Sequence, residues 1–371
     1  MKKQFFTIIT LAIVFITACN KDNDPGNGSG DTYDFTQILA DYVDYTVIPT
    51  YADMKDNAIL LLKSAENYKQ TGAQSDLDQA CEYWKTTRKP WECSEAFLFG
   101  PASYKSLDPL LDSWPLDQAQ LDQVLAGDQE LTADYVSNAL GAVLRGFHTV
   151  EYLLFREGAP RNAADVTGRE KEYLVAVAEV LRNDCLNLWG SWAGIEIGTV
   201  ESQMVEEAEI ELGNPFGHVM KKAGSAGSQF LSQTDAVDEI LLGIIGIADE
   251  VANGKIADPA NSGNVLDVES WFSWNSLTDF QNNIRSIQHS YSGGYDGGTK
   301  GASLSDFVAG KDAILDAEVN AGIDAAIDAI ASIPEPFRNN LDNAEKVNAA
   351  INAVNEVLDL FNNQVRPLFF N

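Results

Sequence analysis

The most constraining part of this sequence is the stretch of residues 146–155, GFHTVEYLLF, which places a histidine and a carboxylate within an apolar run. Apolar residues recur at steps of three and four through this stretch and before it, which predicts one helix over residues 133–156. An adjoining stripe of that helix carries His148 and Glu151 beside Leu144 and Phe155. A helix that is apolar on adjoining faces is buried, so both polar side chains are expected to project into the interior from one face.

Glu151 is the residue that most needs a partner. A buried carboxylate is unfavourable unless it is paired, protonated or bound to a metal. One interpretation is structural: Glu151 forms an ion pair with Arg145 or Arg88, and His148 is a hydrogen-bonded core residue. The other is that His148 and Glu151 are two ligands of a metal site, because di-iron carboxylate bundles use the same spacing in the opposite order. The spacing alone leaves both interpretations open.

The first 32 residues predict export and anchoring. Lys2 and Lys3 precede an apolar run over residues 5–16, and the sequence ITAC ends at Cys19. This is the pattern of a secretory signal, with a run too short to span a bilayer. The small residues before Cys19 resemble a bacterial lipobox, which implies cleavage there and lipid attachment to Cys19. We expect a signal peptide over residues 1–19, a flexible tether over residues 20–32, and a body anchored to the outer membrane, on its periplasmic or cell-surface face.

The charge of the chain excludes one class of partner. The 371 residues carry a formal net charge of −30. A body this acidic repels nucleic acid and anionic lipid, so contact with a membrane is expected only through the lipid on Cys19. Acidity permits cation binding without demonstrating a site, because most acidic side chains lie on the solvated surface.

The cysteines after the signal are Cys81, Cys93 and Cys185, an odd number without CxxC spacing. At most one disulfide can form among them. We predict that they are core residues.

The rest of the chain also predicts helices. Residues 91–99 follow a bend at Lys89 and Pro90 and place Glu95 among aromatic side chains. A long apolar helix is expected over residues 231–253, with a stop at residues 253–255, and further helices over residues 305–333 and 340–364. No run alternates as strands do, so the predicted fold class is all-α, with helices long enough for bundles. A domain boundary is expected between residues 33–205 and residues 206–371.

Four stretches of the sequence resemble blocks of the imelysin family, which is also described as imelysin-like peptidases and iron-regulated lipoproteins. They are WECSEAFLFGP at 91–101, DSWPLD at 112–117, GFHTVE at 146–151 and ESWFSWNSLTDFQNN at 269–283. The resemblance extends over residues 34–371. It implies two helical-bundle domains, each like a four-helix bundle and related by duplication, with a pocket between them that the GxHxxE block faces.

The resemblance also implies site residues. His148 and Glu151 carry over from the GxHxxE block, and Glu95 joins them as a third metal ligand. The residues expected around them in the pocket are Ser94, Trp91, Arg88, Ser273 and Asn283.

Three functions are open at this point. The first is binding of iron, another metal ion or a metal chelate during uptake, together with other envelope proteins of iron import, because ferric iron prefers carboxylate oxygens with a histidine nitrogen. The second is the metallopeptidase activity for which the family is named. HExxH and HxxEH are absent, and His218 and His289 show no ligand spacing, so binding is favoured over catalysis. The third is a non-enzymatic envelope binding module in which His148 and Glu151 brace the domain interface.

Overall fold

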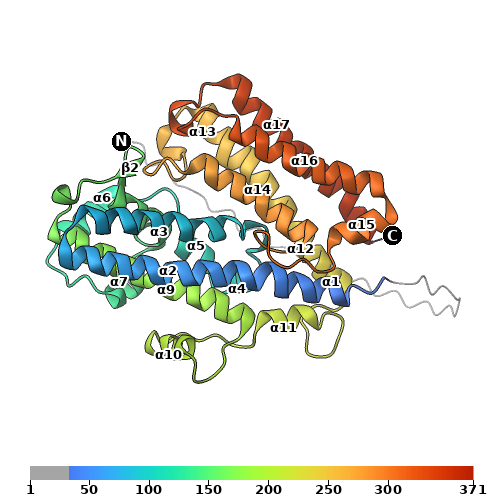
Figure 1. Cartoon of the computed structure of the whole chain (residues 1–371), viewed down its shortest axis with the longest axis horizontal. Coiled ribbons are helices and arrows are strands. Elements are labelled where there is room, and N and C mark those ends of the chain that lie inside the picture. The colour runs from blue at the N-terminus through green and yellow to red at the C-terminus, as the bar shows by residue number, and fades with distance from the viewer. Residues whose placement is uncertain (1–32, 371) are drawn as a thin grey trace, which may run out of the picture. The chain divides into compact units, whose positions relative to one another are not determined.

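Helices form nearly all the regular structure in the computed structural model, which describes residues 33–370 (Figure 1). The one sheet among these residues pairs β1 (Phe155–Arg156) antiparallel with β2 (Ala159–Pro160). The predicted all-α class is confirmed. The first ten α-helices are α1 (Thr36–Asp41), α2 (Ile48–Thr71), α3 (Gln74–Glu92), α4 (Pro101–Tyr104), α5 (Leu107–Asp112), α6 (Gln118–Ala126), α7 (Ala133–Ala139), α8 (Gly146–Leu154), α9 (Gly168–Ala193) and α10 (Val200–Glu207). The others are α11 (Phe216–Lys221), α12 (Gln233–Asp249), α13 (Ala257–Ser262), α14 (Ser276–Ser292), α15 (Leu304–Lys311), α16 (Ala313–Ala331) and α17 (Ala344–Leu360).

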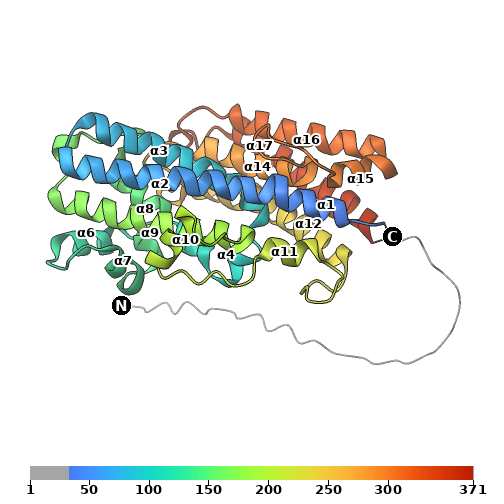
Figure 2. The ribbon, with the colours of Figure 1, turned by 60° about the horizontal axis from the view of Figure 1, so that its bottom comes forward.

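Two groups of four helices make up most of the core. In the first, α2 packs on α3 and α9, and α8 packs on α3 and α9; in the second, α12 and α14 pack with α16 and α17 (Figures 1 and 2). The groups meet where α3 and α14 are in contact, and residues 35–370 cluster as one compact unit. The division into two domains at residue 205 stays a prediction, and that position lies inside α10.

The long helices begin where side chains satisfy their first backbone N–H groups. α9 opens with a capping box of Thr167 and Glu170, and α12 opens with one of Ser232 and Asp235. Each capping side chain accepts a hydrogen bond from a backbone amide that has no partner within the helix. None of the helices within residues 33–370 has the length and apolar content of a membrane span.

The predicted single helix over residues 133–156 is wrong. The structure breaks it into α7, a 3₁₀ turn over Ala142–Leu144, and α8, because Leu140 and Arg145 are extended and Gly146 has a φ of 76°. The carbonyl groups that a continuous helix would use are bonded elsewhere: Leu144 accepts from the Tyr173 hydroxyl at 2.5 Å. Tertiary hydrogen bonds therefore override the local periodicity.

The predicted helix stop at residues 253–255 is also wrong. After α12 the chain continues as a π-helix over Glu250–Ile256 and then as α13. Gly254 and Lys255 therefore lie within a helical segment, and Lys255 is turned inward with a side chain that is 10% exposed. A π-helical turn inserts one residue into the helical repeat, which changes the direction of the side chains that follow.

The cysteine prediction is confirmed for the described part of the chain: Cys81, Cys93 and Cys185 are all buried and free. Burial raises the pKa of each thiol, so these side chains behave as apolar core residues. The predictions made for Cys19, the signal peptide and the tether fall outside residues 33–370.

Two glycines of α12 offer a direct test of the packing between the groups. A Cβ at Gly243 would lie 2.1 Å from the Ala96 carbonyl oxygen, whereas a Cβ at Gly246 would meet nothing within 4 Å. We expect Gly243→Ala to lower the free energy of unfolding by about 1–3 kcal/mol. Gly246→Ala should raise it by up to about 1 kcal/mol, because alanine favours the helix. Equal effects in urea titrations of the two variants would contradict this packing.

Candidate metal centre

Glu151 fixes the orientation of the His148 ring. Both residues are fully buried on α8, and His148 Nδ1 lies 3.1 Å from Glu151 Oε2. The other carboxylate oxygen, Oε1, accepts hydrogen bonds from the backbone N–H of Ser273 at 2.8 Å and from its hydroxyl at 2.7 Å. Both oxygens of Glu151 are therefore engaged, and the second ring nitrogen of His148 faces away from it.

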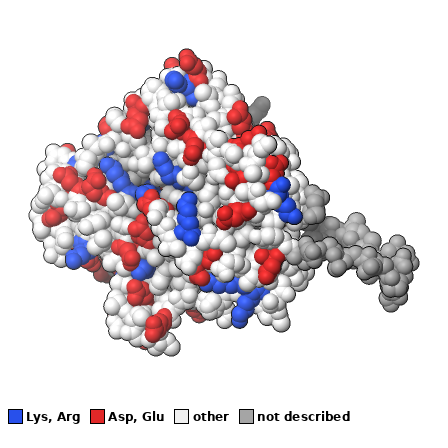
Figure 3. Space-filling model, turned by 45° about the vertical axis from the view of Figure 1, so that its right-hand side comes forward, with Lys and Arg blue, Asp and Glu red and all other residues white. Residues whose placement is uncertain are grey.

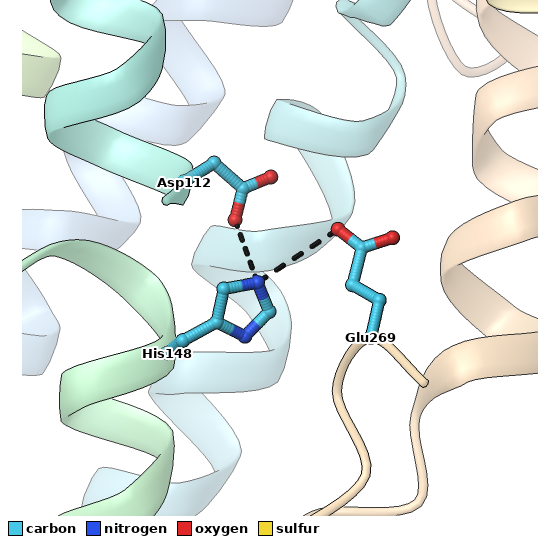
Figure 4. A group of neighbouring side chains, drawn as sticks. All are labelled: Asp112, His148 and Glu269. Carbon is cyan, nitrogen blue, oxygen red and sulfur yellow. Dashed lines mark ion pairs between the residues drawn. The ribbon is translucent and has the colours of Figure 1, made fainter. Parts of the chain in front are cut away.

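That second nitrogen faces two further carboxylates (Figure 4). His148 Nε2 lies 3.1 Å from Asp112 Oδ1 and 3.8 Å from Glu269 Oε1, yet neither contact is aligned as a hydrogen bond, and no other residue of the described chain supplies one. The three ligand atoms lie within 4.8 Å of one another. Two donors that each lie near 2.1 Å from one ion are roughly 3.0–3.4 Å apart, so the set needs only a small closure to hold a metal.

Close backbone approach brings Asp112 to His148. Asp112 is the last residue of α5, and Leu111 precedes it. Gly146, at the start of α8, packs against Leu111. A Cβ at Gly146 would lie 2.3 Å from the Leu111 carbonyl oxygen, at a φ of 76° that disfavours other residues. The glycine of the GxHxxE block therefore has a packing role: it allows α8 to start beside the end of α5.

Glu269 comes from the loop between a 3₁₀ turn and α14. Ser270 and Trp274 both have positive φ, at 51° and 62°, so two non-glycine residues of this loop are held in a disfavoured conformation. The Ser276 hydroxyl donates to the Glu269 carbonyl at 2.6 Å, and Ser273 is tied to Glu151. These bonds hold the loop against α8.

Arg88 is the cation at the centre of the buried carboxylates. Its guanidinium is fully buried and pairs with Asp112, with Glu92 at 2.6 Å and with Glu269 at 2.7 Å, and it lies 3.6 Å from Asp279. The oxygens of Asp112 and Glu269 that it contacts are the ones that face His148. Each carboxylate oxygen has two lone pairs, so pairing with Arg88 leaves a position for a second partner.

The electrostatics differ between the carboxylates. Burial would raise the pKa of Asp112, but the charges of Arg88 and His148 lower it. Burial would likewise raise the pKa of Glu269, but Lys255, His148 and Arg88 lower it to about 2. Both side chains are thus ionised at neutral pH and suited to a cation. Burial would lower the pKa of His148, but the neighbouring carboxylates of Asp112, Glu151 and Glu269 raise it well above the usual value.

A cavity of about 770 Å³ opens beside this cluster. On the face shown in Figure 3, acidic side chains are scattered among basic and uncharged ones. The cavity wall instead gathers seven carboxylates and one lysine, Lys255. A concave surface with this balance favours a cationic ligand. The seven acidic lining residues are Glu95, Asp108, Asp112, Glu250, Asp258, Asp267 and Glu269.

The structure connects most of the predicted site residues to this cluster. Trp91 donates its indole N–H to Asp112 at 2.6 Å, and Asn283 donates its side-chain amide to Glu92. Ser94 points away, since its hydroxyl donates to the Trp91 carbonyl at 2.6 Å.

Glu95 lies in a second group, Glu92–Glu95–Asp112, instead of beside His148. The ion pair considered for Glu151 is absent from the contacts of the described residues: Arg145 pairs with Asp184, and Arg88 pairs with other carboxylates.

Sequence reasoning missed Asp112, Glu269 and Lys255. Asp112 and Glu269 each begin one of the four stretches on which the family resemblance rests, so the signal was present without a reason to select them. Lys255 carried no such signal.

Comparison with known proteins identifies the family of this chain. The imelysin family model, whose name also carries a peptidase label, matches residues 47–363. The chain belongs to the imelysin family. The predicted resemblance is confirmed.

Two solved structures and one curated relative are similar to this chain over about nine-tenths of its length. Iron-regulated protein A of Synechococcus elongatus is 28% identical over 90% of this chain and 86% of its own. The structure of an iron-regulated protein A precursor from Parabacteroides distasonis superposes with a TM-score of 0.81, at 33% identity over 92% of this chain and 97% of that one. An imelysin-like protein from Psychrobacter arcticum shares the fold, with a TM-score of 0.66 at 14% identity over 90% of this chain and 94% of that one.

Removing the central cation tests the electrostatic account. We expect Arg88→Met to lower the free energy of unfolding at pH 7 by about 3–5 kcal/mol, because buried carboxylates lose their partner. The loss should shrink as the pH falls toward 4. Burial raises the pKa of Asp279 to about 7 even though the charge of Arg88 opposes this shift. Without that charge, the buried carboxyls that contact Arg88 become protonated in the folded state at a still higher pH. Acidification then removes their unfavourable charge, so the folded variant gains stability relative to the unfolded chain.

Arg182→Met is the matched control for this variant. Its nearest carboxylate partner is Glu179, at 3.9 Å. Urea titrations across pH 4–8 should show a small and pH-independent change for the control. A change of the same size and pH dependence in both arginine variants would contradict a central role for Arg88.

Proposed function

We propose that this imelysin-family protein binds a metal ion through Asp112, His148 and Glu269, with Glu151 as the residue that orients His148. The observation that carries the proposal is the buried Nε2 of His148, which lacks an aligned hydrogen bond and faces two ionised carboxylates. A histidine that ligates a metal commonly donates its other N–H to a carboxylate, and Glu151 supplies that partner.

Iron is the first candidate for the ion, as cargo of the protein. One imidazole nitrogen with carboxylate oxygens suits ferric and ferrous iron better than it suits soft metals. Relatives similar over most of the chain are named iron-regulated proteins, which supports the same choice. The protonated His148 of the metal-free protein must release its proton on binding, so affinity should weaken in acid. The prediction that Glu151 and Glu95 are direct ligands stays a prediction. In the structure Glu151 contacts Nδ1 of His148, and Glu95 lies in the separate group with Glu92 and Asp112.

The cavity bears on the form in which the metal arrives. A space of about 770 Å³ exceeds what a bare ion needs and lies in the range of small-molecule sites. We propose that it admits a hydrated or chelated metal ion. The protein would act at the cell envelope, anchored through a lipid on Cys19 and working with other envelope proteins of iron import. The variant Cys19→Ser tests the anchor: we expect cell fractionation to find it detached from the membrane.

A second candidate function is metal-dependent peptide hydrolysis. Three protein ligands beside an open cavity are what a catalytic zinc site requires, and the family model carries a peptidase label. Peptide cleavage that requires added zinc and disappears in His148→Gln would favour this function over cargo binding.

Three conservative variants test the proposed ligands. We expect Asp112→Asn, His148→Gln and Glu269→Gln each to weaken binding of ferrous iron by on the order of 100-fold or more, because each removes one of three donors. Glu151→Gln should weaken it by about 10- to 100-fold, as expected for a residue that only orients a ligand. Binding would be measured by anaerobic calorimetric titration of the purified protein, with bound metal counted by mass spectrometry.

Asp267→Asn provides the control, because Asp267 lines the same cavity but lies outside the His148 group. Its affinity for iron should stay within about threefold of the parent. Unchanged binding in all three ligand variants, with their fold verified by circular dichroism, would overturn the proposed site.

A further inference from the structure

Lys255 places a positive charge among the acidic side chains of the site. Its ammonium nitrogen lies 3.1 Å from Glu269 Oε2, 3.7 Å from Glu95 Oε1 and 4.0 Å from Glu92 Oε2. The ammonium also lies 3.9 Å from Glu250. An ammonium has three donors, and among residues 33–370 only Glu269 accepts a hydrogen bond from it, so the group is held by charge more than by directed bonds.

The carboxylates around Lys255 are those that could hold a metal. Glu269 belongs to the group with Asp112 and His148, and Glu92 and Glu95 form a second group with Asp112. The ammonium therefore supplies positive charge where a bound metal ion would supply it. A metal ion bound to Glu269 would share that carboxylate with Lys255, and the two positive charges would repel each other in a buried environment.

The backbone and the cavity give Lys255 a place to move. It lies in the π-helix Glu250–Ile256, a type of turn that occurs frequently at functional sites. Lys255 and Gly254 both line the cavity, next to Asp258 and Asn261. The four-carbon side chain can rotate into this space, where other carboxylates would receive the ammonium.

We propose that Lys255 is a tethered counter-cation that occupies the acidic site in the metal-free protein and is displaced into the cavity when a metal ion binds. This inference rests on the proposed function. The proposed role makes Lys255 a determinant of which cations bind. A tethered ammonium is present at high effective concentration, so a free monovalent cation gains little by replacing it. A divalent or trivalent ion gains more from the same carboxylates and can displace it.

The first experiment compares Lys255→Met with the parent protein. The substitution keeps an unbranched side chain and removes the competing charge. Anaerobic titration with ferrous iron, and separately with Mn²⁺ and Zn²⁺, should show affinity at least about tenfold tighter in the variant. Sodium should compete measurably in the variant and not in the parent. Lys300→Met, which removes the same charge at a different pocket, should leave the affinities unchanged. Unchanged or weaker metal affinity in Lys255→Met would overturn the inference.

The second experiment needs no substitution and therefore does not depend on the variant folding. Lysines of the parent protein are acetylated briefly with an amine-reactive ester, and modification of Lys255 is measured by peptide mass spectrometry with and without iron. Displacement predicts slow modification of Lys255 in the metal-free protein and several-fold faster modification when iron is bound. Equal rates would overturn the inference.

The outcomes separate the two proposals. If the parent binds iron through His148 while Lys255 shows neither the affinity gain nor the change in reactivity, the metal site stands and the counter-cation role fails. If no metal binds to either protein, the proposed function fails and the role of Lys255 fails with it.

Discussion

The buried guanidinium of Arg88 is the interaction on which the rest of this structure depends. It contacts four carboxylates that come from different parts of the chain: Glu92 on its own helix, Asp112 at the end of α5, Glu269 in a loop and Asp279 on α14. Such a set of acids cannot be buried as charged groups without a cation at its centre. Because two of the partners follow residue 265 and the others precede residue 113, one ion-pair network links the two groups of helices.

The network holds more carboxyl groups than cationic side chains. Six buried or nearly buried carboxylates face Arg88, Lys255 and His148, and the adjoining cavity adds more. A purely structural network would be expected to align its hydrogen bonds. Here the His148 Nε2 has no aligned partner within the described chain, and the Lys255 ammonium donates a long hydrogen bond, at 3.4 Å, to Glu269 Oε1. These two features, both at the Glu269 carboxylate, are what a site arranged for an incoming cation should show. They agree with the iron-related names of relatives that share the fold.

The sequence predicted what depends on local spacing and failed where distant segments decide. A three-residue step on one helix was enough to predict that His148 and Glu151 are buried together. It could not show that Glu151 orients the ring, because Ser273, which occupies the other carboxylate oxygen, lies 122 residues away. Nor could it select Asp112 and Glu269 from 55 acidic residues. The break before α8 was hidden for the same reason: periodicity favoured one helix, whereas the close approach of Gly146 to Leu111 requires a new start. The segment containing Lys255 was predicted to be a helix stop because residue 254 is a glycine, and glycine often ends a helix. A π-helical turn has no comparable sequence signature.

The most direct test of the central claim is to locate the ion itself. Crystals of the protein grown without metal and then soaked anaerobically in ferrous salt would be measured on both sides of the iron absorption edge. The proposed site predicts one anomalous peak at roughly 2.0–2.2 Å from His148 Nε2 and from oxygens of Asp112 and Glu269, with Glu151 still bonded to Nδ1. Iron ordered at another place in stoichiometric amount, with His148 and its carboxylates unchanged, would contradict it.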